Sequence, residues 1–144
     1  MINKFPILFN KFLKSEIAKQ FVKFCLVGFL NTLVDFGVYL FFSRVIGLYY
    51  LYANLLAVFV AMTSSFVLNK YWTFKNNDHD LSKQYLKFTL VNVVYFLLNN
   101  AIFFSAVHYL KFFDIWAKVV AIGIGLIWNF LANRYFTFRK NSRS

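Results

Sequence analysis

The sequence predicts an all-α integral membrane protein. We expect one domain over residues 1–144 with four transmembrane helices, arranged as two tandem two-helix repeats in parallel orientation and preceded by an N-terminal amphipathic helix. Hydrophobic residues make up 60% of the 144, more than a globule of this size can bury. The 16 Lys and Arg residues outnumber the 5 Asp and Glu residues, so the charges must lie outside long apolar segments. An internal repeat is the third observation.

The repeat is clearest at the ends of two apolar runs. FVLNKYWTFK, from Phe66 to Lys75, recurs 64 residues later as FLANRYFTFR, from Phe130 to Arg139. QFVKF, which begins at Gln20, recurs in the same register as QYLKF. A single register that fits both ends of the unit indicates a tandem duplication.

The elements follow in chain order. Residues 1–20 combine lysines with apolar residues at helical spacing, which predicts an amphipathic helix lying on an anionic membrane surface. The first repeat covers residues 20–76 and the second covers residues 84–140. Each contains two apolar runs that reach the ~20 residues needed to cross the hydrocarbon core. The expected spans are 22–43, 50–71, 86–109 and 115–136.

The distribution of positive charge predicts the orientation. Three cations, Arg44, Lys111 and Lys118, fall on one side of the four spans, and the other 13 fall on the opposite side. The positive-inside rule therefore places both termini and the middle loop of this multi-pass protein in the cytoplasm. Because each repeat has two spans, the halves are parallel repeats.

Three polar residues inside the expected spans are candidates for contact with a ligand. Asp35 lies deep in the first span, where a carboxylate costs at least ~2.5 kcal/mol and must face protein or a watery cavity. Asn31 lies one helical turn before Asp35. Asn99 is the counterpart of Asp35 in the second repeat. We expect these three to bind the hydroxyl groups of a sugar. Alternatively they join helices, or Asp35 pairs with Lys118.

A second group of polar residues lies at the predicted cytoplasmic boundary. Its basic members suit a lipid phosphate, although anchoring the helices is an equally direct explanation. The amides are harder to explain as anchors. The expected phosphate-binding residues are Lys23, Asn69, Lys70, Asn133 and Arg134.

Trp72 and Tyr135 are expected to lie in an interfacial aromatic belt, with stacking on a sugar face as a second possible role. No His, Cys or carboxylate cluster has metal-ligand spacing, so no metal or other cofactor is expected. No nucleophile has a visible base, so we expect no enzyme. Nucleic acid is not expected as a partner, because lipid-buried segments cannot form a duplex-binding surface.

The motifs FCLVGFLNTLVDF, beginning at Phe24, and FVLNKYWTF, beginning at Phe66, resemble those of the GtrA family, with a second Asn-basic-aromatic motif at 133–138. The resemblance implies a protein of the bacterial cytoplasmic (inner) membrane that translocates a polyprenyl-phosphate-linked monosaccharide for cell-surface polysaccharide glycosylation. It also implies a membrane glycosyltransferase as a partner. The second half departs from the first at Asn92 and Tyr95. The matching positions are Gly28, Asn31, Asp35, Asn69, Lys70, Trp72, Asn133 and Arg134.

Two other functions stay open. A small four-span proton-coupled cation exporter would use Asp35 as a shared proton and substrate site. Such exporters that insert in both orientations need nearly balanced loop charge, and 13 against 3 is not balanced. A non-transporting accessory subunit that recruits a glycosyltransferase fits the composition equally well. Because four spans enclose little space, we also expect a homo-oligomer, a dimer or larger.

Overall fold

A computed structural model describes residue 7, residues 10–11 and residues 14–139. Half of the predicted amphipathic helix over residues 1–20 lies outside the described residues, and its last five residues belong to the first long helix. The described part of the chain is helical and contains no strand, which confirms the all-α class.

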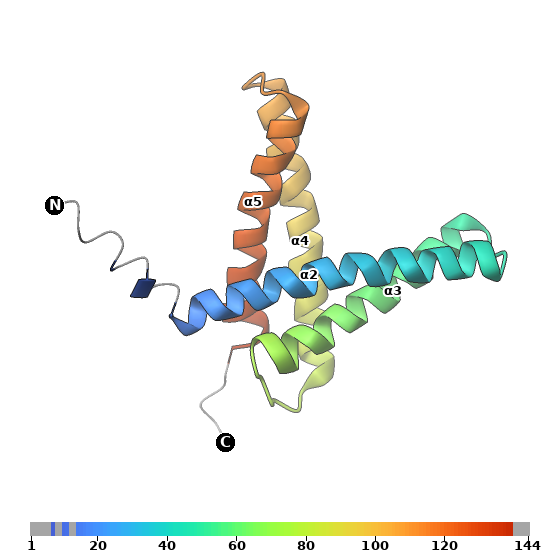
Figure 1. Cartoon of the computed structure of the whole chain (residues 1–144), viewed down its shortest axis with the longest axis horizontal. Coiled ribbons are helices and arrows are strands. Elements are labelled where there is room, and N and C mark those ends of the chain that lie inside the picture. Colours follow the sequence, from blue (N-terminus) through green and yellow to red (C-terminus); the bar gives the residue numbers. More distant parts are fainter. Residues whose placement is uncertain (1–6, 8–9, 12–13, 140–144) are drawn as a thin grey trace. The chain divides into compact units, whose positions relative to one another are not determined.

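The chain forms two compact units, Met1–Asn77 and Asp78–Ser144. Each unit consists of two neighbouring long helices joined by a short link (Figure 1). Each second helix ends in a π-helical turn. Unit 1 contains α2 (Glu16–Leu40), η1 (Phe41–Val45), α3 (Tyr50–Leu68) and η2 (Asn69–Thr73), and unit 2 contains α4 (Leu81–His108), α5 (Asp114–Ala132) and η3 (Asn133–Thr137).

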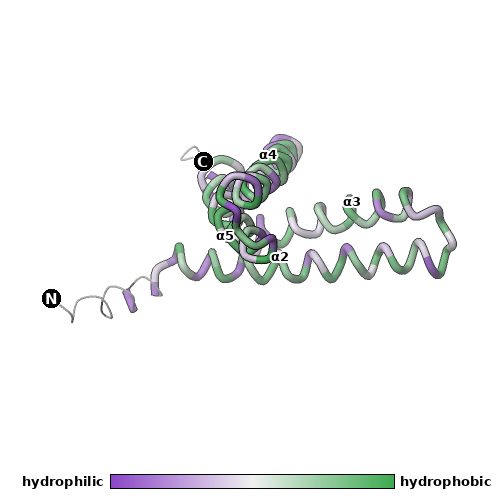
Figure 2. Tube along the Cα trace, turned by 90° about the horizontal axis from the view of Figure 1, so that it is seen from above, coloured by the Kyte–Doolittle hydropathy of each residue, from purple (hydrophilic) through white to green (hydrophobic). Residues whose placement is uncertain are grey.

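Four continuous helical segments are long and apolar enough to cross a membrane. Their number agrees with the prediction, and each segment contains or closely overlaps the expected span. Figure 2 shows that apolar residues predominate along α2 and α3. The segments are Glu16–Val45, Tyr50–Thr73, Leu81–His108 and Asp114–Thr137.

Side-chain caps explain where the first helix of each unit begins. The Ser15 hydroxyl accepts a hydrogen bond from the Ala18 N–H at 3.3 Å, and the Asp80 carboxylate accepts one from the Lys83 N–H at 3.4 Å. These bonds satisfy backbone donors that have no partner within a first helical turn. At the opposite end, Gly47 turns the chain with a φ of 76°, and Lys111 does so in unit 2 with a φ of 55°.

Small side chains allow the helices of each unit to pack closely. A buried stripe with four-residue spacing runs along α3 and another runs along α5, which is the spacing that brings residues onto one helical face. The stripe on α3 consists of Ala53, Ala57, Ala61 and Ser65, and the stripe on α5 of Ala117, Ala121, Gly125 and Asn129.

Buried aromatic residues close the end of each unit at which η2 or η3 lies, which we call the motif end. The Phe24 and Phe74 ring centroids lie 6.2 Å apart in unit 1, and those of Phe88 and Phe138 lie 6.1 Å apart in unit 2. All four rings are buried. The residues of each pair are therefore spaced alike in both units, in the 64-residue register of the sequence.

Candidate functional site

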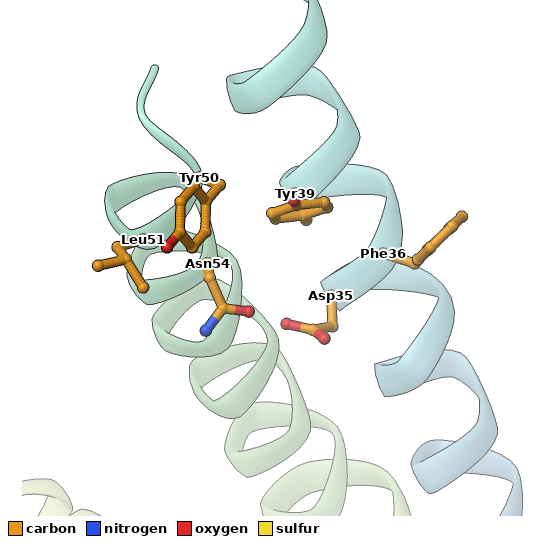
Figure 3. A pocket seen from close by; sticks show the side chains of 6 residues that line it. All are labelled: Asp35, Phe36, Tyr39, Tyr50, Leu51 and Asn54. Carbon is orange, nitrogen blue, oxygen red and sulfur yellow. The ribbon is translucent and has the colours of Figure 1, made fainter. Parts of the chain in front are cut away.

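Unit 1 contains a cavity of about 420 Å³ between α2 and the first turns of α3. Its polar lining is supplied by Asp35 and Tyr39 from α2 and by Tyr50 and Asn54 from α3. The Asp35 carboxylate and the Asn54 amide point toward each other, whereas Phe36 points away from them (Figure 3). We call this space the Asp35 cavity.

The Asp35 carboxylate lies near the middle of its span without full hydrogen bonding. Asp35 precedes Val45, the end of the segment, by ten residues, or roughly 15 Å along a helix. Its Oδ1 atom is buried and has no hydrogen-bond partner. A buried acceptor in a membrane span is costly, so a ligand that donates hydrogen bonds or carries positive charge would be stabilised here.

Asn31 lies one turn away from Asp35 on α2, but it does not line the cavity. Its Oδ1 atom is also buried without a partner. The structure thus brings Asp35 together with Asn54, a residue that the sequence analysis did not select. A lone amide in the apolar run of α3 was the signal for Asn54. Tyr39 and Tyr50 gave no signal, because tyrosines are common near the ends of membrane helices.

Asn99 occupies the corresponding position in unit 2 but lies in a tighter environment. A Cβ atom added at Gly125 would lie 3.3 Å from Asn99 Nδ2 and 2.7 Å from Tyr95 Cε2, so both side chains lie against α5. Asn99 Nδ2 is buried without a hydrogen-bond partner. The interhelical role is therefore the more direct interpretation of Asn99, while its sugar-binding role stays a prediction.

The two motif asparagines are part of the packing at the motif ends. Asn69 is 2% exposed and donates through Nδ2 to Ser65 Oγ at 3.3 Å. Asn133 is 0% exposed and donates to Asn129 Oδ1 at 2.7 Å. Asn129 in turn donates to Asn92 Oδ1 on α4 at 3.5 Å, so amides link the two helices of unit 2.

The departure of the second repeat at Asn92 now has a structural reason. The counterparts of Asn92 and Asn129 in unit 1 are Gly28 and Ser65, which are smaller. Unit 2 replaces this small pair by two amides that hydrogen-bond across the helix interface. The Oδ1 atoms of Asn69 and Asn133 are buried and have no partner.

The basic residue that follows each asparagine is differently placed in the two units. Lys70 is 0% exposed, and its ammonium donates to Asn76 Oδ1 at 3.2 Å. A phosphate would reach Lys70 only after this end of unit 1 had opened. Arg134 is half-buried, and its guanidinium carbon lies 5.5 Å from the centre of the Tyr135 ring.

Lys23 is more accessible than Lys70. Its Nζ atom lies 5.4 Å from the centre of the Trp72 ring, and it donates to the Trp72 carbonyl oxygen at 3.5 Å. In unit 2, Lys87 Nζ lies 5.0 Å from the centre of the Phe136 ring. Trp72 and Tyr135 are both exposed, as an aromatic belt requires.

A second cavity, of about 290 Å³, lies at the motif end of unit 2. We call it the basic pocket because three cations, Lys83, Lys87 and Arg139, line it together with two carboxylates, Asp78 and Asp80. Tyr135 also lines it, whereas Arg134 does not. The sequence analysis did not select Lys83, Lys87 or Arg139 as ligands, because basic residues beside a membrane span are usual.

The predicted sugar and phosphate residues of unit 1 lie near opposite ends of the helix pair. Fifteen residues of continuous helix separate Asn54 in the Asp35 cavity from Asn69 in the motif, which corresponds to roughly 22 Å. A phosphate joined directly to one sugar cannot bridge this distance. These two positions of unit 1 therefore suit successive positions of one headgroup rather than simultaneous contacts.

Comparison with known proteins gives two findings. Residues 23–138 match the model of the family described as GtrA/DPMS, transmembrane domain. The chain is also 30% identical over 127 residues to the uncharacterized membrane protein YngA of Bacillus subtilis (strain 168), covering 85% of this chain and 82% of that protein.

Proposed function

This chain belongs to the GtrA/DPMS transmembrane-domain family, and on that premise we propose that it translocates a polyprenyl-phosphate-linked monosaccharide across the bacterial cytoplasmic membrane. The product would supply sugars for glycosylation of cell-surface polysaccharide. The proposal includes no catalysis of its own. A membrane glycosyltransferase is the proposed source of the lipid-linked sugar, and the working form is a homo-oligomer.

The Asp35 cavity is the observation that carries this proposal. A lipid carrier can keep its hydrocarbon tail in the bilayer, but its sugar brings several hydroxyl groups into a region without water. Asp35, Asn54 and the two tyrosines Tyr39 and Tyr50 line a space of about 420 Å³ at this depth. An acceptor that already lacks a partner lowers the cost of placing hydroxyl donors there.

The separation of the two ends of unit 1 supports a stepwise path. The headgroup would first be held by cations at the motif end and then pass to the Asp35 cavity. The polyprenyl tail stays in lipid throughout. Net direction would come from consumption of the sugar on the outer side, because no energy source is built into this scheme. The same path requires the motif ends to face the cytoplasm, in agreement with the excess of positive charge there.

A flipping assay with purified protein in liposomes tests the proposal. A fluorescent short-chain polyprenyl-phosphate sugar is placed in both leaflets, and the fraction protected from a membrane-impermeant quencher is followed over time. Parent protein should make the inner pool accessible. Asp35→Asn should slow this exchange by about tenfold or more, since hydrogen bonds to a charged group contribute about 1.5–3 kcal/mol.

A matched control is Asp114→Asn, because this carboxylate lies at the start of α5 outside the Asp35 cavity. It should leave the rate unchanged. Equal rates for parent protein and a correctly folded Asp35→Asn variant would contradict the assignment of the cavity. If the probe crosses the bilayer equally fast in liposomes with and without the protein, the proposed function itself is contradicted.

Cation export is the second candidate, and one observation favours it. A carboxylate with two neighbouring tyrosines is also suited to an organic cation, which is attracted by the charge and by the aromatic faces. Uptake of a hydrophobic cation into liposomes driven by a proton gradient, lost in Asp35→Asn, would favour this candidate. The lipid-linked sugar would then have no effect on uptake.

A further inference from the structure

The motif that recurs in the two repeats contains a threonine to which the sequence analysis gave no role. Thr73 is 1% exposed and Thr137 is 2% exposed. In each case the hydroxyl oxygen is buried and has no hydrogen-bond partner. A threonine in a helix usually satisfies its hydroxyl by donating to the carbonyl of the preceding turn. Thr32, Thr63 and Thr89 of this chain do so.

Thr137 differs from Thr73 because a cavity lies beside it. Thr137 is one of the residues that line the basic pocket of about 290 Å³, and its hydroxyl is buried and has no partner. Lys87 and Arg139 line the same space. A hydroxyl donor and two cations around one small pocket form a donor set suited to an anion with several acceptor oxygens.

The two carboxylates that line the pocket already accept hydrogen bonds from the protein. Asp78 Oδ1 accepts a hydrogen bond from the Asp80 N–H at 3.3 Å. Asp80 caps α4 and pairs with Lys83 Nζ at 3.5 Å. Within the part of the chain that the structure describes, neither Lys87 nor Arg139 takes part in an ion pair. The lining carries three cations and two carboxylates, so one net positive charge is left to attract an anion, and Lys87 and Arg139 are the cations that can contact it.

From this geometry we propose that the basic pocket of unit 2 binds the phosphate of a lipid headgroup, through Lys87, Arg139 and the Thr137 hydroxyl. This inference rests on the proposed function and gives its phosphate a different location from the motif cations. Lys70 is fully buried and bonded to Asn76, and Arg134 does not line the pocket. The phosphate would lie beside the exposed Tyr135 ring, at the level of the aromatic belt, with its hydrocarbon chain in lipid.

Unit 1 provides an internal comparison. The counterparts of the three ligands are Lys23, Lys75 and Thr73. Lys23 Nζ already donates to the Trp72 carbonyl oxygen, and Lys19 is paired with Glu16 at 3.2 Å. The charges of Lys19, Lys75 and Lys23 all act on the Glu16 carboxylate. Lys23 is thus held by a carbonyl oxygen, whereas Lys87, Arg139 and Thr137 line one pocket, so we assign the phosphate to unit 2.

Binding of farnesyl monophosphate to the purified full chain in phosphatidylcholine nanodiscs tests the assignment. The dissociation constant is measured for the parent and for Lys87→Gln, Arg139→Gln and Thr137→Val. Each change removes a charge or a hydroxyl and keeps much of the side-chain volume. Each should weaken binding by about tenfold, the factor that corresponds to loss of one hydrogen bond to a charged group. Thr73→Val and Lys118→Gln are matched controls and should bind as the parent does.

The arms of the experiment separate the inference from the proposed function. Farnesol, which has no phosphate, should not compete, and inorganic phosphate should compete only weakly if the lipid supplies the headgroup. If phosphatidylglycerol competes as well as farnesyl monophosphate, and the same variants lose both, the headgroup site stands but selection of a polyprenyl carrier fails. If the parent binds the probe and the three variants bind it equally well, the assignment to the basic pocket is wrong and the proposed function is unaffected.

Retained tight binding in Thr137→Val with loss in both cation variants would remove the hydroxyl from the site. A parent protein that binds no phosphorylated lipid would overturn the site altogether. Elution volume and melting temperature are recorded for every variant, and a variant that fails these checks is replaced by Lys87→Met or Arg139→Met.

Discussion

Gly125 offers a direct test of the packing within unit 2. A Cβ atom at this position would lie 2.7 Å from Tyr95 Cε2 and 3.3 Å from Asn99 Nδ2. A separation of 2.7 Å between carbons is well inside the ~3.5–4.0 Å of optimal contact, so the Tyr95 ring or the helix must move. Gly123, two residues earlier on α5, has nothing within 4 Å of an added Cβ atom.

The two positions therefore give opposite expectations for the same substitution. Gly123→Ala should stabilise the protein by up to about 1 kcal/mol, because alanine has the higher helix propensity. Gly125→Ala has the same propensity gain but adds an overpacking cost of about 1–3 kcal/mol. The difference in the free energy of unfolding between the variants should thus be about 1–3 kcal/mol, with Gly125→Ala the less stable.

Thermal or SDS-induced unfolding in one detergent measures this difference. The double variant Tyr95→Ala/Gly125→Ala should recover part of the loss, since the atom that the new methyl group meets has been removed. Equal stability of Gly123→Ala and Gly125→Ala would refute the close approach of α4 and α5 at this point. If Gly125→Ala lowers stability and the added Tyr95→Ala substitution does not restore any of it, the steric clash does not involve the Tyr95 ring.

Three further predictions concern the ends of the units. Asp80→Ala should destabilise the protein by about 0.5–2 kcal/mol, seen as a lower melting temperature, because α4 loses its cap, whereas Asp114→Ala removes no cap of this kind. Lys111→Gly should raise the melting temperature slightly or leave it unchanged. The left-handed backbone at this position costs a residue with a side chain about 1–2 kcal/mol and costs glycine nothing. The greater freedom of glycine in the unfolded chain offsets part of this gain in stability. Asn76→Ala should lower the free energy of unfolding by about 1.5–3 kcal/mol, since it removes a hydrogen-bond acceptor from the buried Lys70 ammonium. An unchanged unfolding midpoint would show that this ammonium reaches water.

The number and approximate limits of the spans were predictable because hydrophobicity is read directly from composition along the chain. The residues at which the helices begin were harder to predict. The first long helix begins at Glu16, well before the apolar run, because Ser15 caps it and the charged residues between form part of the same helix. The π-helical turns at the motifs could not be predicted, since they depend on backbone hydrogen bonds such as that from Phe74 N–H to the Asn69 carbonyl.

The candidate site was predictable in part for similar reasons. Asp35 stood out because a carboxylate in an apolar segment is rare and costly. Its neighbour Asn54 depends on how α2 and α3 face each other, which one sequence does not specify. Lys70 was selected for its place at the end of a span, but its burial arises from the chain beyond η2, which returns so that Asn76 meets the ammonium.

The same register that relates the two units also brings out how their chemistry differs. At the depth of the Asp35 cavity, Asp35 and Asn54 in unit 1 correspond to Asn99 and Lys118 in unit 2. One pair contributes a negative charge and the other a positive charge, so unit 1 attracts a cation at this depth and unit 2 repels it. At the motif ends the contrast reverses, because Lys87 and Arg139 border a pocket while Lys23 is held by a carbonyl oxygen. A symmetric pair of sites would give a headgroup two equal places to stop. On the proposed function, two unlike sites would let phosphate and sugar be recognised by different units. This division predicts that the double variant Asp35→Asn/Asn99→Asp will not regain the flipping rate of the parent protein.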